Sequence, residues 1–219
     1  MMALAMTARP GVDHAPAKPE TRRLATELDR ATLDRARALE PVALRAFVVR
    51  YERPVFALLS RMVGPGPHVE DLAQETFLRA FKALPAFRLD GPARASTWLL
   101  TIATRLALDS RKKKRLPLAP PEAANDVADR STPETEGARR ELGRRLARAA
   151  GELSDDHRAA LLLSDVHGFT LAEIGEALGI PEATAKTRVF RARQHMREQL
   201  ADLRDVGPRD SRDLGTGEE

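Results

Sequence analysis

The sequence contains no cysteine among its 219 residues. This absence excludes disulfide bonds, iron–sulfur clusters held by cysteine and cysteine-ligated zinc sites. The fold must therefore be held together by packing, as suits a reducing compartment, and we expect a cytoplasmic location.

Long apolar runs are also missing. A membrane-spanning helix needs about 18 consecutive apolar residues, and the sequence contains no such run. The opening segment MMALAMTARPG has no basic n-region and too short an apolar run for a signal peptide. We therefore expect neither secretion nor insertion into a membrane.

Patterns typical of strands are scarce as well. Aromatic residues make up only 4% of the chain, and runs that alternate apolar with polar residues between turns are missing. The apolar residues recur instead at spacings of three and four, which predicts an all-α fold. The hydrophobic content of 42% is enough for one ordinary core or two small ones.

Residue clusters that would carry catalysis are missing too. The five histidines show no HExxH or other metal-ligand spacing, no glycine-rich phosphate loop follows a strand, and no serine lies in a nucleophile elbow. We therefore expect no catalytic residue, no metal and no cofactor, and we classify the chain as a non-enzyme. Its 36 Lys and Arg residues and net charge of +4 point instead to a polyanionic partner.

Proline-rich and charged stretches divide the chain into two helical domains. The linker between them carries Pro117, Pro120, Pro121 and Pro133, which exclude a continuous helix. The predicted segments are a flexible N-terminal extension with one marginal helix (1–36), a first domain (37–115), a flexible linker (116–137), a second domain (138–203) and a disordered tail (204–219).

The first domain opens with apolar residues at helical spacing from Phe47 to Met62. Pro54 predicts a kink or a break near Arg53, and the GPGP turn at residues 64–67 ends the element. The next helix, residues 69–82, buries one apolar stripe and leaves a second face, which carries Asp71, Gln74, Glu75 and Leu78. This face is either a solvated surface with one stray leucine or a docking surface for a basic, partly apolar partner.

A third helix in this domain is predicted from Thr97, with Ser96 as its N-cap. It ends in a basic run at residues 111–115, a placement that suits the helix dipole. Trp98 either packs in the core or provides a stacking platform beside this basic run. The predicted core stripe is Leu99, Ile102, Ala103, Leu106 and Ala107.

The second domain carries the signals of a helix-turn-helix. Ser154 is expected to cap one helix that ends at Gly168, and Thr170 to Glu173 fits a capping box. The helix that follows stops at Gly179, and Pro181 opens a last helix that is rich in basic residues. Two helices joined by a short turn in this way are typical of DNA-binding units, although an ordinary basic helix in a bundle would share part of the pattern.

Physical chemistry separates the roles of the residues in this motif. An apolar set is expected to lock the two helices together: Ile174, Leu178, Ile180, Ala183 and Val189. The residues expected to face the groove can pair with guanine edges or phosphates, or contact a thymine methyl group. They are Lys186, Thr187, Phe190 and Arg191. Arg188 and Arg193 are expected to hold phosphates.

Four segments together resemble the extracytoplasmic-function sigma factors of the sigma-70 family. They are DLAQETFLRAF, STWLLTIATRLALD with its basic run, the proline-rich linker, and FTLAEIGEALGIPEATAKTRVFRAR. The resemblance covers residues 37–203, with the second and fourth conserved regions in order. It implies a sigma subunit that binds core RNA polymerase and directs promoter recognition, melting and transcription initiation. It also implies an anti-sigma protein as a further partner.

The resemblance assigns residues to three surfaces. The surface for core polymerase would comprise Asp71, Gln74, Glu75, Leu78 and Arg79. The surface for the minus-ten element would comprise Phe87, Arg88, Trp98, Ile102, Ala103, Arg105, Arg111 and Lys112. The surface for the minus-thirty-five element would comprise Lys186, Thr187, Arg188, Phe190, Arg191 and Arg193. Two positions depart from the family pattern, because Arg105 stands where Asn is common and Thr187 where Ser is frequent.

The alternative is a stand-alone helix-turn-helix transcriptional regulator, whose second domain would look the same. Its first domain would sense a ligand or dimerise, and so would need a pocket or a self-complementary face. The first domain shows instead an outer face of acids and leucine and a basic helix end. This pattern favours the sigma factor.

Overall fold

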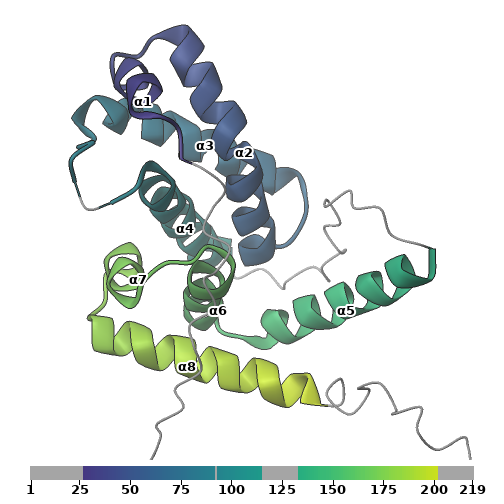
Figure 1. The fold of residues 1–219 in the computed structure, drawn as a ribbon. Coiled ribbons are helices and arrows are strands. Elements are labelled where there is room, and N and C mark those ends of the chain that lie inside the picture. The colour runs from purple at the N-terminus through teal and green to yellow at the C-terminus, as the bar shows by residue number, and fades with distance from the viewer. Residues whose placement is uncertain (1–26, 92, 115–132, 202–219) are drawn as a thin grey trace, which may run out of the picture.

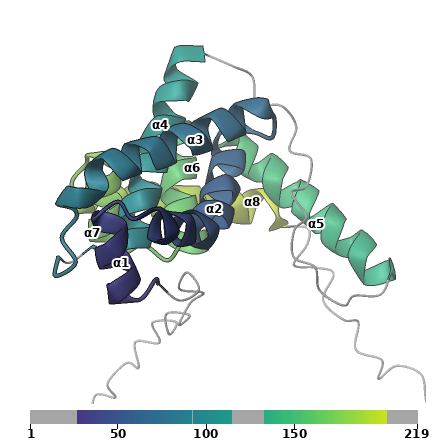
Figure 2. The same cartoon turned by 90° about the horizontal axis from the view of Figure 1, so that it is seen from above.

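The computed structural model describes residues 27–91, 93–114 and 133–201, and within these ranges every regular element is a helix. The all-α prediction is therefore confirmed. Figure 1 shows α1 to α4 in one group and α6 to α8 in a second. Helix α5 extends outward from them, and Figure 2 shows this from above. The elements are α1 (Arg30–Arg37), α2 (Pro41–Val63), α3 (Pro67–Ala83), η1 (Leu84–Ala86), α4 (Ala95–Lys114), α5 (Pro133–Glu152), α6 (Asp155–Leu161), η2 (Leu162–Val166), α7 (Leu171–Leu178) and α8 (Glu182–Gln199).

Helix α1 lies largely within the segment that the sequence assigned to a flexible extension with one marginal helix. Asp29 caps it, because its carboxylate accepts a hydrogen bond from the Thr32 amide at 2.9 Å. Leu33 and Ala36 are buried in the core, and the helix packs against α2. The packed structure therefore begins before residue 37. Residues 1–26 lie outside the described part of the chain.

Helix α2 runs without interruption through Pro54, so of the kink or break predicted near Arg53 the break does not occur. A proline inside a helix removes one hydrogen bond and crowds the preceding turn. Here the buried residues on both sides of it, Tyr51 and Val55 among them, stay on one core-facing stripe. The packing of this stripe therefore outweighs the lost hydrogen bond and the crowding at Pro54. The GPGP turn ends α2 as predicted, with Gly64 at a φ of 82°.

Ser96 is not the N-cap of α4, because the helix already begins at Ala95. Ser96 is buried, and its hydroxyl group donates a hydrogen bond to the Glu27 carboxylate. The other oxygen of that carboxylate accepts a hydrogen bond from the Tyr51 hydroxyl at 2.7 Å. Burial and the bond to Glu27 raise the pKa of Tyr51. This cluster ties the segment before α1 to both α2 and α4.

The helix-turn-helix has the local geometry that its sequence signals predict. Thr170 and Glu173 form the capping box at the start of α7, and Gly179 ends this helix in the left-handed conformation at a φ of 66°. Gly175 allows the turn to approach closely, because a Cβ atom there would lie 2.8 Å from the carbonyl oxygen of Ile180. Ser154 caps α6 as predicted.

The two groups of helices share one hydrophobic core. Helix α4 packs against α2 and α3 on one side and against α6 and α7 on the other. The buried cluster is continuous from Phe47 in α2 through Leu99 in α4 to Leu163 and Ile174. The sequence predicted two tethered domains, whereas the structure brings them into direct contact. Residues 116–132 of the predicted linker lie outside the described residues, whereas its last residues, 133–137, belong to α5 and are not linker.

Candidate polymerase and nucleic-acid interfaces

The outer face of α3 presents the predicted acid-and-leucine pattern on the surface. Leu78 is 47% exposed, and Asp71, Gln74 and Arg79 are exposed around it. Arg79 and Glu75 form an ion pair of 2.6 Å at i,i+4 spacing, which holds the two side chains along this face. The structure therefore places all five predicted docking residues together on one accessible helix face.

A small cavity lies beside the loop that precedes α4. Its volume is about 180 Å³. Phe87 is buried and packs on the half-buried Trp98, with ring centroids 4.9 Å apart and ring planes at 37°. Core packing is therefore part of the role of Trp98. The lining of the cavity is Glu27, Leu33, Phe87, Leu89, Gly91, Ala93, Arg94 and Ala95. Two of the predicted minus-ten residues lie in this loop. Phe87 lines the cavity, and the next residue, Arg88, is exposed on the surface.

The predicted minus-ten residues on α4 occupy different environments. Ala103 is 0% exposed in the core, which leaves it no surface for DNA, and its predicted role in binding is wrong in this arrangement. Ile102 is half-buried against the core, whereas Lys112 is exposed. Arg105 donates to the carbonyl oxygens of Glu176 at 2.7 Å and Ala177 at 3.0 Å.

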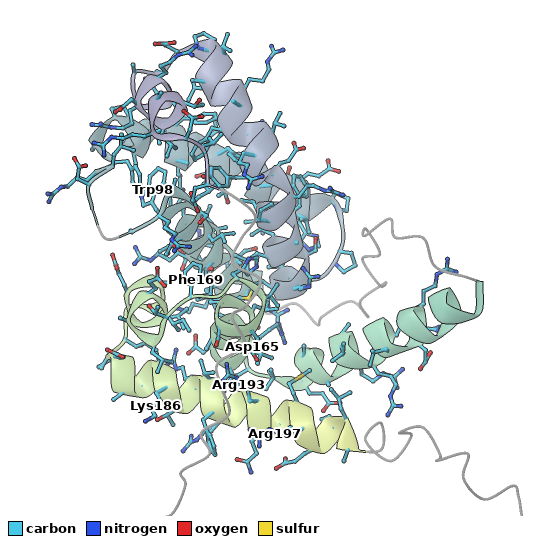
Figure 3. All side chains as sticks on the ribbon, viewed as in Figure 1. Trp98, Asp165, Phe169, Lys186, Arg193 and Arg197 are labelled. Atoms are coloured by element: carbon cyan, nitrogen blue, oxygen red, sulfur yellow. The ribbon has the colours of Figure 1, made fainter. Side chains whose placement is uncertain are left out.

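Helix α8 has two distinct faces. Ala185, Val189 and Ala192 are buried at spacings of four and three. Four side chains predicted to face the groove are exposed: Lys186, Thr187, Phe190 and Arg191. Figure 3 shows Lys186 on this helix. Ala183 is exposed rather than part of the core, so its predicted locking role is wrong, and Ala185 serves that role.

The two arginines predicted to hold phosphates pair with carboxylates of the same domain. Arg188 lies 3.1 Å from Asp156. Arg193 lies 2.6 Å from Asp165 and donates to the Ser164 hydroxyl at 2.9 Å (Figure 3). Hydrogen bonding to Asp165 raises the pKa of Arg193. In this structure both arginines fix α8 against the elements beneath it.

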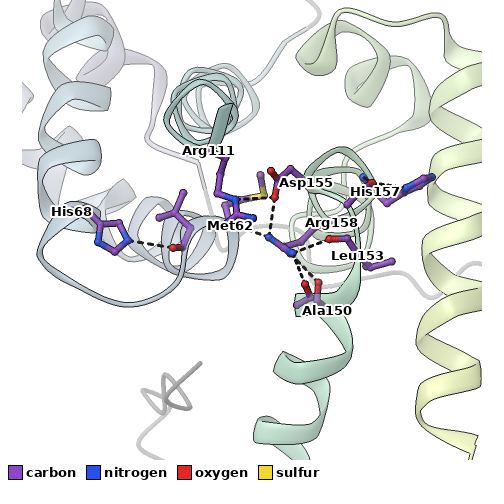
Figure 4. A network of polar contacts seen from close by, with 11 residues as sticks. Met62, His68, Arg111, Ala150, Leu153, Asp155, His157 and Arg158 are labelled. Atoms are coloured by element: carbon purple, nitrogen blue, oxygen red, sulfur yellow. Dashed lines mark hydrogen bonds and ion pairs between the residues drawn. The ribbon is translucent and has the colours of Figure 1, made fainter. Parts of the chain in front are cut away.

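The sequence reasoning missed Arg158, which is 1% exposed and lies at the centre of a polar network (Figure 4). Its guanidinium donates to the carbonyls of Ala150, Gly151 and Leu153 at 2.8 to 2.9 Å, and to that of Met62 at 3.2 Å. It also contacts Asp155 at 3.2 Å. Burial lowers its pKa. A signal was present in the sequence, because Arg158 shares a helical stripe with the buried residues 161 and 162.

His167 is a second buried polar residue whose burial the sequence analysis did not predict. It is 5% exposed, and among the described residues neither ring nitrogen has a hydrogen-bond partner. Burial, together with the positive charge of Arg61, lowers its pKa from 6.5 to about 4. The imidazole is therefore neutral in the folded protein near neutral pH.

Within the described ranges no helix is both long and apolar enough to cross a bilayer. The same ranges contain no group of three or more histidine or carboxylate side chains arranged to hold a metal ion.

Comparisons with known proteins match both groups of helices. The profile of Sigma-70 region 2 matches residues 47–116, and that of Sigma-70 region 4 matches residues 143–196. The ECF RNA polymerase sigma factor SigW of Bacillus subtilis (strain 168) is 36% identical over 163 residues, which is 70% of this chain and 86% of SigW.

Two solved structures are similar in fold. CnrH, in complex with the cytosolic domain of CnrY, aligns with a TM-score of 0.56 at 23% identity and covers 82% of this chain and 99% of CnrH. The sigma factor RpoE of Bartonella quintana, in complex with the anti-sigma factor NepR, aligns with a TM-score of 0.56 at 22% identity. That alignment covers 72% of this chain and 96% of RpoE.

Proposed function

Because this chain belongs to the extracytoplasmic-function sigma factors, which bind core RNA polymerase and direct transcription initiation at specific promoters, we propose that three of its surfaces divide that work. Sigma factors are initiation factors rather than enzymes, and the stand-alone regulator is not favoured. The observation that carries the assignment is the match of regions 2 and 4, in order, to the two successive groups of helices.

The α3 face docks on core polymerase in this proposal. An exposed leucine surrounded by carboxylate, amide and guanidinium groups fits a partner surface that is partly apolar and partly basic. Leu78 would lose its exposed area to the partner, while Asp71 and the Glu75–Arg79 pair would fix the orientation at the rim.

The loop at residues 87–95 and the exposed side of α4 bind the melted minus-ten element. Extruding a base costs a few kcal/mol of lost stacking and pairing, so a protein that binds it needs a compensating pocket. The cavity lined by Phe87 and Leu89 supplies apolar walls, and Arg94 supplies a cation for the backbone. Arg88, Arg105, Arg111 and Lys112 would contact phosphates or base edges.

The exposed face of α8 reads the minus-thirty-five element in the major groove. Lys186 and Arg191 can donate to guanine or to phosphates, and Phe190, 59% exposed, can contact a thymine methyl group. Thr187 lies on the same exposed side. Arg188 and Arg193 act first as braces for this helix through their carboxylate partners.

An anti-sigma protein and a cytoplasmic location complete the proposal. CnrH and RpoE, which share this fold, were solved with the cytosolic domain of CnrY and with the anti-sigma factor NepR. A protein of that class is proposed here as a regulatory partner. We place the chain in the cytoplasm because it works on RNA polymerase.

Run-off transcription with purified core polymerase on a promoter library tests the residue roles. The wild-type chain should select a shared two-part promoter. Lys186→Ala and Arg191→Ala should relax the minus-thirty-five preference, at a cost of about 1 to 3 kcal/mol per lost base contact. Arg197→Ala, an exposed arginine near the end of α8, is the matched control. Unchanged selection by both test variants would contradict the proposed reading face.

Leu78→Ala tests the docking face in a binding assay with core polymerase. It should weaken binding without altering the fold, because the leucine is exposed and supports no core contact. Leu142→Ala is the matched control, since Leu142 is similarly exposed at 43% but lies on α5. Equal effects of the two substitutions would contradict the assignment of α3.

A further inference from the structure

One wall of the cavity beside the loop at residues 87–95 comes from the segment that precedes α2. Glu27, just before α1, and Leu33, within α1, both line this cavity. The profile of Sigma-70 region 2 begins at residue 47, so both residues lie outside the part of the chain that it matches. Their contribution to the cavity therefore does not follow from the family profile.

Three hydrogen bonds fix the Glu27 carboxylate in this wall. Its Oε1 atom accepts from the Ser96 hydroxyl, while Oε2 accepts from the Tyr51 hydroxyl at 2.7 Å and from the Ser96 amide at 3.4 Å. Ser96 and Tyr51 are 2% and 3% exposed, so both partners belong to the core. A carboxylate that is held from both α2 and α4 has little freedom to turn away from the cavity.

Helix α1 is also fastened to the segment that forms the other walls. Arg30 pairs with Asp90 at 2.8 Å. Arg37 donates to the Pro85 carbonyl at 3.4 Å. The first of these contacts is exposed and contributes little stability by itself, but Leu33 is buried in the core beside the cavity. The wall and the loop are therefore positioned as one unit.

The lining combines apolar walls with two charged groups. Leu33, Phe87 and Leu89 supply apolar surface. The charged residues in the lining are Glu27 and Arg94. Arg94 is exposed, so its guanidinium can reach the phosphate of a bound nucleotide. Glu27 is half-buried and would repel a phosphate, so its partner must be a different group.

The free hydrogen-bonding capacity of Glu27 defines that partner. An ionised carboxylate has about four lone-pair positions and no donor. Ser96 and Tyr51 already use three of them, which leaves about one for a ligand. Cytosine, adenine and guanine each carry an exocyclic amino group that can donate to it. The ring N–H of thymine lies instead between carbonyl oxygens, which a carboxylate repels.

We propose that Glu27 is a specificity-determining residue of this cavity, where its carboxylate accepts a hydrogen bond from the exocyclic amino group of an extruded minus-ten base. The cavity therefore takes a base that carries such a group and disfavours thymine. The apolar walls contact the base, Glu27 selects it, and Arg94 holds its phosphate. This inference rests on the proposed minus-ten role of the cavity.

Run-off transcription with purified core polymerase, on promoters randomised through the minus-ten element, tests this selection. The wild-type chain should disfavour thymine at one position by about tenfold, the size of one specific base contact. Glu27→Gln keeps the shape and one oxygen of the carboxylate but adds an amide donor, which can bond to a carbonyl oxygen of thymine. This variant should lose most of the discrimination. Glu52→Gln makes the same change at an exposed position on α2 and should keep it.

Two outcomes of this selection would overturn the proposal. The first is a wild type that accepts thymine at every position. The second is a Glu27→Gln variant that keeps the wild-type preference, even if its activity falls to the same degree on every promoter. A carboxylate that only held Ser96 and Tyr51 in place would give the second result.

A base analogue tests the same contact in the wild-type chain, so the result does not depend on how well a variant folds. At the position that the selection identifies, the preferred base is replaced by its analogue in which hydrogen replaces the amino group. The wild-type chain bound to core polymerase should bind a single-stranded oligonucleotide with this analogue about tenfold more weakly than the parent. Equal binding of the two oligonucleotides would overturn the proposal.

Ala93→Phe separates this inference from the proposed function, because it adds bulk to the lining of the cavity and leaves the carboxylate in place. If this variant binds the parent oligonucleotide as the wild type does, the minus-ten role of the cavity fails and the role of Glu27 fails with it. If it binds more weakly while Glu27→Gln keeps the base preference, the cavity keeps its role and only the selection by Glu27 is refuted.

Discussion

Mild acid should destabilise the fold through the buried His167. Its pKa is about 4 in the folded chain against 6.5 for an unperturbed histidine. The unfolded chain therefore binds more protons between these values, and the free energy of unfolding falls as the pH falls. The stability is fully present above the unfolded pKa and is lost as the pH drops toward the folded one.

The size of this effect follows from the two pKa values. At about pH 5 the loss is about 2 kcal/mol, and it approaches about 3.4 kcal/mol below the folded pKa, because a tenfold change in proton affinity corresponds to about 1.4 kcal/mol. Because typical domains are stable by only about 5 to 15 kcal/mol, a loss of this size is measurable. Arg61 adds to the effect, because its charge opposes a second cation nearby.

Urea denaturation followed by circular dichroism over about pH 5 to 7 measures the effect. His167→Leu removes the titrating group. The free energy of unfolding of this variant should therefore lack the loss of about 2 kcal/mol that His167 causes in the wild type between about pH 7 and pH 5.

Equal slopes in wild type and His167→Leu would refute the reasoning. If His167→Leu does not fold, the imidazole resonances of the wild type can be titrated directly by NMR. A His167 pKa near the unperturbed value would then contradict the effect of burial.

Three further substitutions test the packing. Arg158→Met should destabilise the chain by about 3 kcal/mol in urea denaturation, because it leaves several buried carbonyls without a donor, whereas the exposed Arg197→Met should change stability by less than about 0.5 kcal/mol. Gly175→Ala should cost about 1 to 3 kcal/mol because its Cβ meets a carbonyl, whereas Gly151→Ala, with open space around it, should not destabilise the chain, and thermal melts compare the two. Thr170→Ala should cost about 1 kcal/mol by removing the capping box, and an unchanged melting temperature would contradict that role.

Local signals in the sequence predicted the features that depend on residues close together. The capping box at Thr170, the glycine turn at Gly179 and the outer face of α3 all follow from short spacings, and the structure contains them. The placement of Lys186 on the exposed side of α8 belongs to the same group. Capping and helical periodicity act within a few residues, so one chain is enough to predict them.

Features that depend on distant residues were not predictable in the same way. Ser96 looked like a cap because its partner, Glu27, lies 69 positions away in sequence. The contact between Arg105 and α7 joins positions 71 and 72 apart, and no local pattern predicts it. The error at Ala183 has a different cause. The stripe predicted across the turn did not match the register of α8, which begins at Glu182 and buries residues 185, 189 and 192.

In their proposed minus-ten role, Arg105 and Arg111 must leave their partners inside the protein before they contact DNA, and this affects how ionic strength acts on binding. Binding of arginine to phosphate releases counterions from the DNA. This release gains less free energy at a higher salt concentration, so added salt weakens the binding. The same salt screens the Arg111–Asp155 pair, whose side chains are 14% and 32% exposed, and so releases Arg111 more easily. The two effects oppose each other. Affinity for the melted strand should therefore fall less steeply with salt than the number of phosphate contacts alone would require.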